Sequence, residues 1–194
     1  MTQITDPAQK QSKNRAAKPR LPLDAARVRS LALHYVGRYA TTRKRLSDYL
    51  ARKVRERGWN GSDSDNDFES QREISNIVEH CVALGYVNDE AFATARAASL
   101  LRRGYGASRV RLALSQAGID AQQAQSASDI DPESALLAVH RFAKRKRIGP
   151  YARVEPDKKA HDRALAACLR AGHSFENARK VLESPRESLS LPNL

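Results

Sequence analysis

The residues whose types and spacing suit a chemical role are basic and occur in short runs. They are Arg43, Lys44, Arg45, Arg102, Arg103, Arg109, Arg111, Lys144, Arg145, Lys146 and Arg147, with Tyr105 beside the second run. Guanidinium and ammonium groups neutralise phosphates, and a tyrosine ring stacks on an unpaired base. For any one of these cations a solvated helix face is the commoner role, but the set as a whole predicts a surface that contacts a polyanion.

The charge of the whole chain agrees with such a surface. The formal net charge is +12 and the sequence pI is about 10.1, so the protein attracts polyanions and repels copies of itself. Nucleic acid, an acidic protein groove and an anionic membrane are the candidate partners. No apolar run approaches the roughly 20 residues that cross a bilayer, and the N-terminus lacks the apolar region of a signal peptide. We therefore expect a cytoplasmic monomer that does not contact membranes.

Residues for catalysis or metal binding do not occur in the usual patterns. The 5 histidines form no His-x-x-x-His pair and no Gly-x-Ser-x-Gly elbow is present. Cys81 and Cys168 lie far apart, outside any Cys-x-x-Cys pair, on apolar stripes that predict burial. The acidic stretch from Asp63 has Phe68 where a calcium loop needs glycine. We expect no enzymatic activity, no cofactor and no metal.

The elements that must position the basic runs are predicted to be helices. Only 6% of the residues are aromatic, and the 41% that are hydrophobic are mostly Ala, Leu and Val, which favour an all-α fold. Apolar residues recur at three- and four-residue steps, and an acidic surface loop is expected over 60–70. The expected helical stretches run from Asp24 to Tyr39, Leu46 to Arg57, Ile74 to Leu84, Asp89 to Arg103, Val110 to Ala117, Ala121 to Ser128, Pro132 into Lys144–Arg147, Leu165 to Leu169 and Phe175 to Leu182.

Three turns between these helices share their chemistry. They are Tyr39-Ala40-Thr41-Thr42, Arg103-Gly104-Tyr105-Gly106 and Ala171-Gly172-His173-Ser174. The second residue is small in all three, and the last suits the N-cap of the helix that follows. Repeated units that contact mainly their neighbours build an elongated, curved array with a concave face. The helix N-termini at Thr42 and Gly106 are expected to offer N–H groups to a phosphate.

The most specific pattern lies in the middle of the chain and resembles the central signature of the RecX family. It comprises Leu84-Gly85-Tyr86-Val87-Asn88-Asp89-Glu90-Ala91-Phe92-Ala93, then Arg102-Arg103-Gly104-Tyr105-Gly106, and then Arg109-Val110, Leu114 and Gly118-Ile119. A weaker resemblance extends from about Leu31 to Leu182. The first repeated turn, where that family has Arg and Ser, and the acidic insertion depart from the family pattern.

The resemblance implies a fold and a function. It implies three tandem three-helix units and a regulator of DNA repair, recombination and the SOS response. Such a regulator binds the RecA recombinase, usually in its filament on single-stranded DNA, and limits its activity. On this basis we divide the chain into a disordered basic arm (1–21), a first repeat with the acidic loop (22–86), a second repeat (87–130), a third repeat (131–184) and a flexible tail (185–194).

A second hypothesis remains open from the sequence. A short glycine turn joins the helices around Leu100 and Val110, as in helix-turn-helix proteins that read one duplex site by base identity. The two hypotheses differ in the expected ligand. A filament regulator prefers the recombinase–DNA filament to bare DNA, whereas a transcriptional regulator prefers one duplex sequence.

Overall fold

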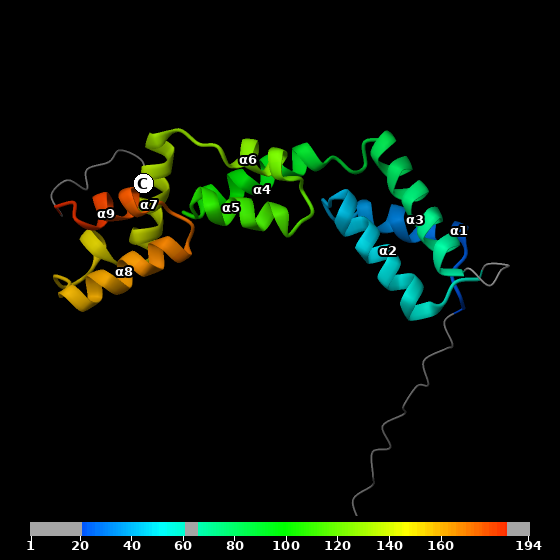
Figure 1. Cartoon of the computed structure of the whole chain (residues 1–194), viewed down its shortest axis with the longest axis horizontal. Helices are drawn as coiled ribbons and strands as arrows, with labels where there is room; N and C mark the ends of the chain where they lie inside the picture. Colours follow the sequence, from blue (N-terminus) through cyan, green and yellow to red (C-terminus); the bar gives the residue numbers. More distant parts are fainter. Residues whose placement is uncertain (1–20, 61–65, 186–194) are drawn as a thin grey trace, which may run out of the picture.

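The computed structural model describes residues 21–60 and 66–185. Within these ranges it contains nine α-helices, one short 3-10 helix and no strand beyond an isolated bridge between Leu23 and Trp59. The helices form three units in an elongated row, and the middle unit lies above the line that joins the outer two (Figure 1). The predicted all-α, elongated and curved array of three-helix units is confirmed. The expected basic arm, and the tail after 185, lie outside the described residues.

The first unit consists of α1 (Ala25–Val36), α2 (Arg43–Arg57) and α3 (Asn66–Ala83). The Asp24 side chain caps α1, and Gly58 ends α2 with a positive φ of 80° that glycine adopts without strain. Apolar residues at helical spacing on all three helices meet in one core. Its fully buried members include Val28, Leu46, Leu50 and Cys81.

The second unit consists of α4 (Asp89–Arg102), α5 (Ala107–Ser115) and α6 (Ala121–Ser128). Its core is built largely from small residues, with Leu114 and Val110 as its largest fully buried side chains. Alanines on α4 and α6 allow the helices to approach closely. The unit therefore has little apolar volume of its own and depends on contacts with its neighbours.

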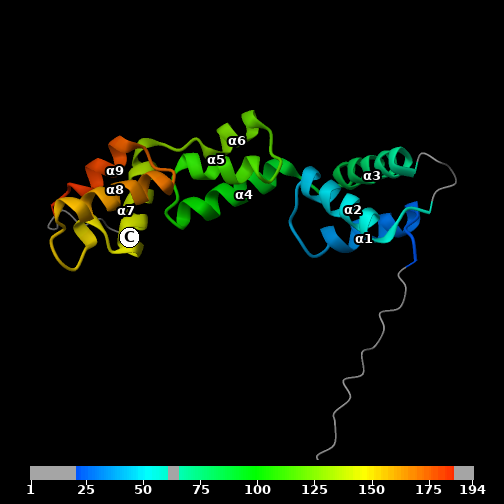
Figure 2. The same cartoon turned by 60° about the horizontal axis from the view of Figure 1, so that its bottom comes forward.

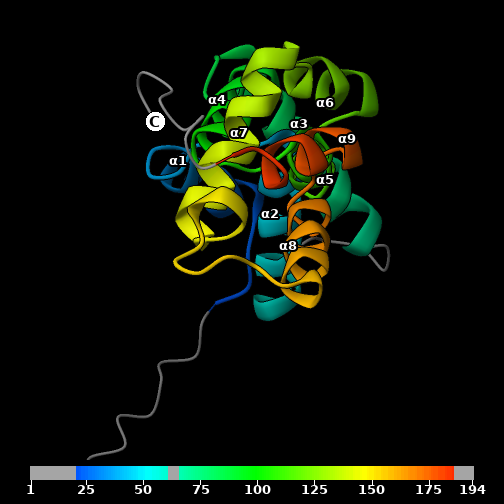
Figure 3. The same cartoon turned by 90° about the vertical axis from the view of Figure 1, so that its left-hand side faces the viewer.

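The third unit consists of α7 (Pro132–Lys146), the 3-10 helix η1 (Gly149–Tyr151), α8 (Lys158–Arg170) and α9 (Phe175–Leu182). Asp131 caps α7, with Pro132 in its first turn, as the Asp-Pro pair predicts. The core contains Val139, Phe142, Cys168 and Val181, among others. Seen from the side and along the row, α8 runs on the same side of the molecule as α2 (Figures 1 and 3).

Several expectations for individual residues are wrong. The acidic loop is shorter than 60–70 because α3 begins at Asn66, and Asp67 and Glu69 lie in its first turn, where carboxylates stabilise the positive end of the helix dipole. Tyr39 and Leu84 follow the ends of α1 and α3 and are exposed. On α4 the buried alanines are at positions 93 and 97, whereas Ala95 faces solvent.

The three repeated turns cap the helices that follow them, as expected, but they do not occupy equivalent places. Thr42, Gly106 and Ser174 are the N-caps of α2, α5 and α9. The turns thus lie between the first and second helices of the first two units, but between the second and third helices of the last. This shift brings the second and third turns against each other.

Two joints connect the units. In the first joint, Thr42 Oγ1 donates to the Ala117 carbonyl at 2.5 Å and the Arg43 backbone N–H donates to Asp89 Oδ1 at 2.9 Å. In the second joint, Gly106 N–H donates to the Ala171 carbonyl at 2.9 Å. The backbones there approach so closely that a Cβ added to Gly106 would lie 2.2 Å from the Gly172 carbonyl oxygen. Only glycine fits this contact.

Candidate functional site

A basic cleft opens beside the second joint, where the turn between α4 and α5 meets α7 and the end of α8. Its volume is about 840 Å³. The lining contains seven cations and no carboxylate among the described residues. The seven cations are Arg102, Arg103, Arg109, Arg141, Arg145, Lys146 and Arg170, and the rest of the lining is Tyr105, Phe142, Ala167 and Ala171. The three elements that meet here are visible between the middle and last units in Figure 2.

Aromatic rings hold two of the cleft guanidinium groups in place. The Arg145 guanidinium lies 5.2 Å from the centroid of the Tyr105 ring and 5.5 Å from that of Phe142, and it donates a hydrogen bond to the Arg103 carbonyl. The Arg103 guanidinium lies 5.7 Å from the Tyr105 centroid. Cation–π contact restricts both side chains. Tyr105 therefore positions two arginines of the cleft, and the base stacking expected of its ring stays a prediction.

The charge of the cleft is uncompensated within the described part of the chain. None of its seven cations forms an ion pair with a carboxylate of residues 21–60 or 66–185. Like charges gathered in one concave surface repel each other and focus the electrostatic field into solvent. A bound polyanion would relieve this repulsion. The cleft is thus suited to a chain of phosphates or carboxylates.

The other predicted cations do not reach this cleft. Arg43 pairs with Glu79 at 2.6 Å and Lys44 with Asp48 at 2.7 Å. The Arg45 guanidinium lies 5.2 Å from the Phe92 ring centroid, across the first joint. Arg111 donates to Ser108 Oγ on its own helix. Lys144 and Arg147 are exposed at the end of α7 but do not line the cleft.

Sequence reasoning missed Arg141 and Arg170. Arg141 precedes Arg145 by one helical turn on α7, so both project to the same face. Arg170 ends α8 just before the third repeated turn, in the position that Arg102 holds before the second. Both signals were present in the sequence, the first in the helical spacing and the second in the repeat itself.

The helix N-termini are not accessible to phosphate, which corrects the expectation for Thr42 and Gly106. Thr42 is buried, and the first N–H of α2 donates to Asp89. At the start of α5, Ser108 N–H donates to the Gly172 carbonyl at 3.2 Å. The joints between units therefore use the hydrogen-bonding groups that an anion would need. Arginine and lysine side chains remain as the groups that can contact a polyanion.

This occlusion also argues against the helix-turn-helix hypothesis. A recognition helix reads base edges with residues near its N-terminus. The first turn of α5 instead packs on the backbone of Gly172, where a Cβ would lie 2.3 Å from the Arg109 nitrogen. The third unit therefore covers the N-terminus of α5.

Burial shifts the pKa values of three further side chains, those of His173, His140 and Cys168. His173 Nε2 lies 3.2 Å from the Gly104 carbonyl oxygen in the second joint, and burial lowers the pKa of His173 while this contact opposes the shift. Burial also lowers the pKa of His140 and raises that of Cys168 to about 11. Within 21–60 and 66–185, no three His, Cys, Asp or Glu side chains lie close enough to hold a metal.

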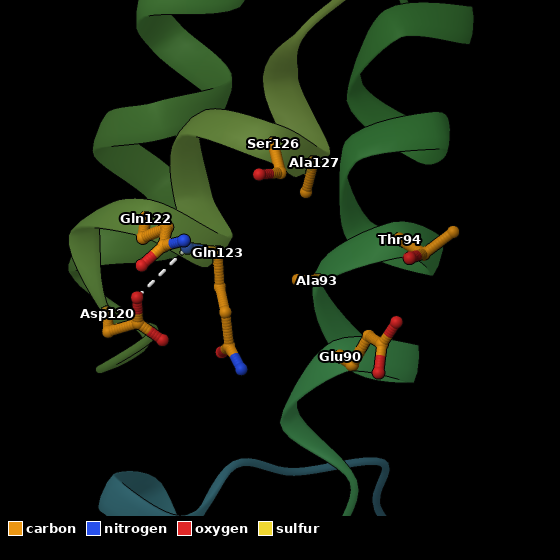
Figure 4. Close-up of a pocket in the computed structure, with 8 residues that line it drawn as sticks. All are labelled: Glu90, Ala93, Thr94, Asp120, Gln122, Gln123, Ser126 and Ala127. Carbon is orange, nitrogen blue, oxygen red and sulfur yellow. Dashed lines mark hydrogen bonds between the residues drawn. The ribbon is translucent and has the colours of Figure 1, made fainter.

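A second cavity of about 690 Å³ lies between α4 and α6 (Figure 4). Glu90 and Thr94 project from α4, and Asp120 and Gln123 come from the opposite wall. Asp120 Oδ1 already accepts the Gln123 backbone N–H at 2.9 Å as the cap of α6. None of the predicted site residues lies in this cavity. The second unit thus carries an acidic pocket as well as its part of the basic cleft.

The fold and the site together define a helical-repeat protein with a basic cleft between its second and third units. Among the described residues, no helix has the length and apolar character to span a membrane. The RecX second three-helix domain model matches residues 88–127. Regulatory protein RecX of Myxococcus xanthus (strain DK1622) is 34% identical over 162 residues, which cover 81% of this chain and 84% of the relative. The chain belongs to the RecX family of regulatory proteins.

Other relatives agree with this assignment. Regulatory protein RecX of Agrobacterium fabrum (strain C58 / ATCC 33970) is 29% identical over 166 residues, which cover 82% of this chain and 84% of the relative. A crystal structure of regulatory protein RecX has a TM-score of 0.63 at 17% identity, over 82% of this chain and 72% of that one. The crystal structure of RecX from Lactobacillus salivarius has a TM-score of 0.58 at 21% identity, over 82% and 94%. These structures share the fold.

Proposed function

We propose that this protein binds the RecA recombinase in its filament on single-stranded DNA and inhibits recombinase activity during DNA repair and homologous recombination in the cytoplasm. It acts as a monomer, without catalysis. Family membership supports the regulatory role. The observation that carries the proposal is the basic cleft, because its seven cations have no carboxylate partner among the described residues.

The shape of the molecule suits a filament better than a compact ligand. The row of units is elongated and bent, with α2 and α8 on the concave side (Figure 1). The cleft lies beside α8 near the bend between the second and third units. A filament offers a continuous anionic surface that a curved array contacts at several points. Phosphates of the bound strand and acidic groups of the recombinase are both suitable ligands for the cleft.

Binding measured over a salt titration tests the proposal. Fluorescence anisotropy would compare a labelled single strand, a duplex and a recombinase filament on the same strand. We expect the filament to bind most tightly, and log affinity for the bare single strand to fall linearly with log salt, with a slope of about −0.7 per neutralised phosphate. Equal affinity for filament and bare DNA would overturn recombinase docking. A flat salt response would overturn phosphate binding.

Matched variants locate the interaction. Arg141→Gln with Arg170→Gln removes two cleft cations, and Arg72→Gln with Arg153→Gln removes two exposed arginines from outside the cleft. Both double variants change the net charge equally. We expect the cleft pair to lower filament affinity and inhibition of strand exchange, while the control pair retains both. Equal losses in the two double variants would show that only overall charge matters.

A further inference from the structure

Three tyrosines form an aromatic cluster on the first unit, away from the basic cleft. The Tyr35 and Tyr49 rings are stacked, with centroids 4.2 Å apart and planes inclined by 19°. The Tyr39 ring lies 5.3 Å from that of Tyr35, tilted by 49°. Tyr35 and Tyr49 are half-buried against the core, whereas Tyr39 is 55% exposed. The stacked pair thus supports one exposed ring.

The backbone holds this exposed ring in a defined position. Tyr39 follows the end of α1, and its N–H donates to the Tyr35 carbonyl at 3.0 Å. Two and three residues later, Thr41 and Thr42 are buried, and the Thr42 hydroxyl donates a hydrogen bond to the second unit. The Tyr39 backbone is therefore held on both sides, so that little backbone entropy would be lost if the ring bound a flat ligand.

Cations surround the tyrosine cluster. The Arg52 guanidinium and the Lys53 ammonium lie 5.7 Å and 5.9 Å from the Tyr49 centroid. These two share Glu56 as an ion-pair partner, at 3.7 Å and 2.7 Å. Arg38 is exposed next to Tyr39 and forms no ion pair with a carboxylate of the described residues. The three cations named here outnumber the one carboxylate, so the tyrosine cluster as a whole lies beside net positive charge.

An exposed ring among cations matches the chemistry of a single-stranded nucleic acid. Bases stack on aromatic side chains whatever their sequence, and the neighbouring phosphates require positive charge. The basic cleft has the charge but no free ring, because Tyr105 already contacts two guanidinium groups. Helix α2, which carries Arg52 and Lys53, lies on the same side of the row as α8 (Figures 1 and 3).

We propose that Tyr39 stacks on an unpaired base of single-stranded nucleic acid, with Arg38 contacting the adjoining phosphate, as a second site distinct from the basic cleft. The inference rests on the proposed function in one respect, that the partner includes a single strand. In this proposal the first unit binds bases by stacking, and the cleft between the other two units neutralises most of the phosphates.

The test uses the full chain, a fluorescein-labelled oligothymidine and heparin, a polyanion without bases. Tyr39→Leu removes the ring, Tyr39→Phe retains it, and Tyr86→Leu makes the same change at a tyrosine that is 54% exposed but contacts no ring of the described residues. We expect Tyr39→Leu to weaken oligothymidine binding by about 5- to 150-fold without changing the salt slope. Tyr39→Phe and Tyr86→Leu should bind like the wild type, and heparin affinity should be equal in all four proteins.

Each other outcome overturns the inference in a recognisable way. If the wild-type chain binds oligothymidine and Tyr39→Leu binds it equally well, the stacking site is absent while the proposed function stands. If Tyr39→Leu weakens only recombinase-filament binding, the ring contacts protein instead of a base. Equal weakening of heparin and oligothymidine binding would indicate a general structural effect. If the wild-type chain fails to bind any single strand, free or in a filament, both proposals fall.

Discussion

Each of the two joints between units involves copies of the repeated turn, but the basic residues beside the two joints differ in their ion-pair partners. At the first joint two cations of the basic run that follows the turn are neutralised, because Arg43 and Lys44 each pair with a carboxylate, while Arg45 lies against the Phe92 ring. At the second joint the neighbouring cations face one another across a cleft without a carboxylate among its described lining residues. Similar runs of sequence therefore form ion pairs within the first unit in one place and line the candidate basic cleft in the other. The arrangement of acidic residues nearby decides which.

The joints also differ in what holds them together. The first depends on side chains, chiefly the Thr42 hydroxyl and the Asp89 carboxylate. The second is a backbone contact between two glycine turns, with Gly106 and Gly172 in direct apposition. A backbone contact tolerates no added atom, whereas a side-chain contact can be weakened in steps. Substitutions at the second joint should therefore have the larger effects.

The largest effect is expected for Gly172→Ala. At φ of +90° the new Cβ would lie 2.3 Å from the Arg109 nitrogen, so that strain and overpacking act together. We expect the free energy of unfolding to fall by about 3 kcal/mol in urea titrations followed by circular dichroism. Gly85→Ala is the control, because Gly85 has φ of +75° and open space around its Cβ position. It should lose only about 1 kcal/mol. Equal losses would show that the backbone contact is unimportant.

Thr42→Val comes next and breaks the first joint. Valine has the shape of threonine but leaves the Ala117 carbonyl and the Arg45 N–H without the hydroxyl that now bonds to both. We expect a loss of about 2 kcal/mol in the same unfolding assay. Thr42→Ser keeps the hydroxyl and loses only a buried methyl group, so its expected loss is about 1 kcal/mol. A serine variant less stable than the valine variant would contradict this account of the joint.

Secondary structure was largely predictable from the sequence because it depends on local signals. Apolar spacing, the Asp24 and Asp131 caps and the glycine after Arg57 each act within a few residues. The start of α3 was missed because its first turn is acidic and polar, which resembles a loop in composition although it suits a helix N-terminus. The exposed Tyr39 and Leu84 were misplaced because the apolar periodicity continues past the last residues of α1 and α3.

The candidate site was only partly predictable because it depends on packing between units. The runs around Arg102 and Arg145 were recognisable as basic, but nothing local shows that they face the same cleft. Nor does the sequence reveal that Glu79, distant in the chain, neutralises Arg43. The occlusion of the α5 N-terminus by Gly172 likewise follows from the third unit's position. Ion pairs and backbone hydrogen bonds between residues distant in the sequence therefore determine which of the predicted residues remain accessible to a ligand.

The third prediction compares the charges of the two joints directly. Arg43→Gln with Lys44→Gln removes as many cations as the cleft double variant does, but from residues that already have carboxylate partners. Because such pairs contribute little to the field felt by a ligand, we expect the salt slope for single-strand binding to be unchanged. The cleft variant should reduce the magnitude of that slope by up to about 1.4, or 0.7 for each phosphate that is no longer neutralised. Similar reductions in both would mean that the paired run also binds the strand.

The smallest effect expected is a pH dependence of stability that arises at the second joint. Burial holds the pKa of His173 below its ordinary value of 6.5. The unfolded chain therefore binds a proton at this residue as pH falls through about 6.5, while the folded chain does not, so the free energy of unfolding decreases on the acid side. His173→Gln should make this decrease between pH 7 and 5 smaller, as measured by urea unfolding at each pH. His140 has the same direction of shift but lies away from the joint, against Tyr151. His140→Gln should therefore leave the pH dependence of oligothymidine binding unchanged, whereas His173→Gln alters it if the joint shapes the cleft. Identical binding profiles for the two variants would show that the imidazole at the joint has no influence on the cleft.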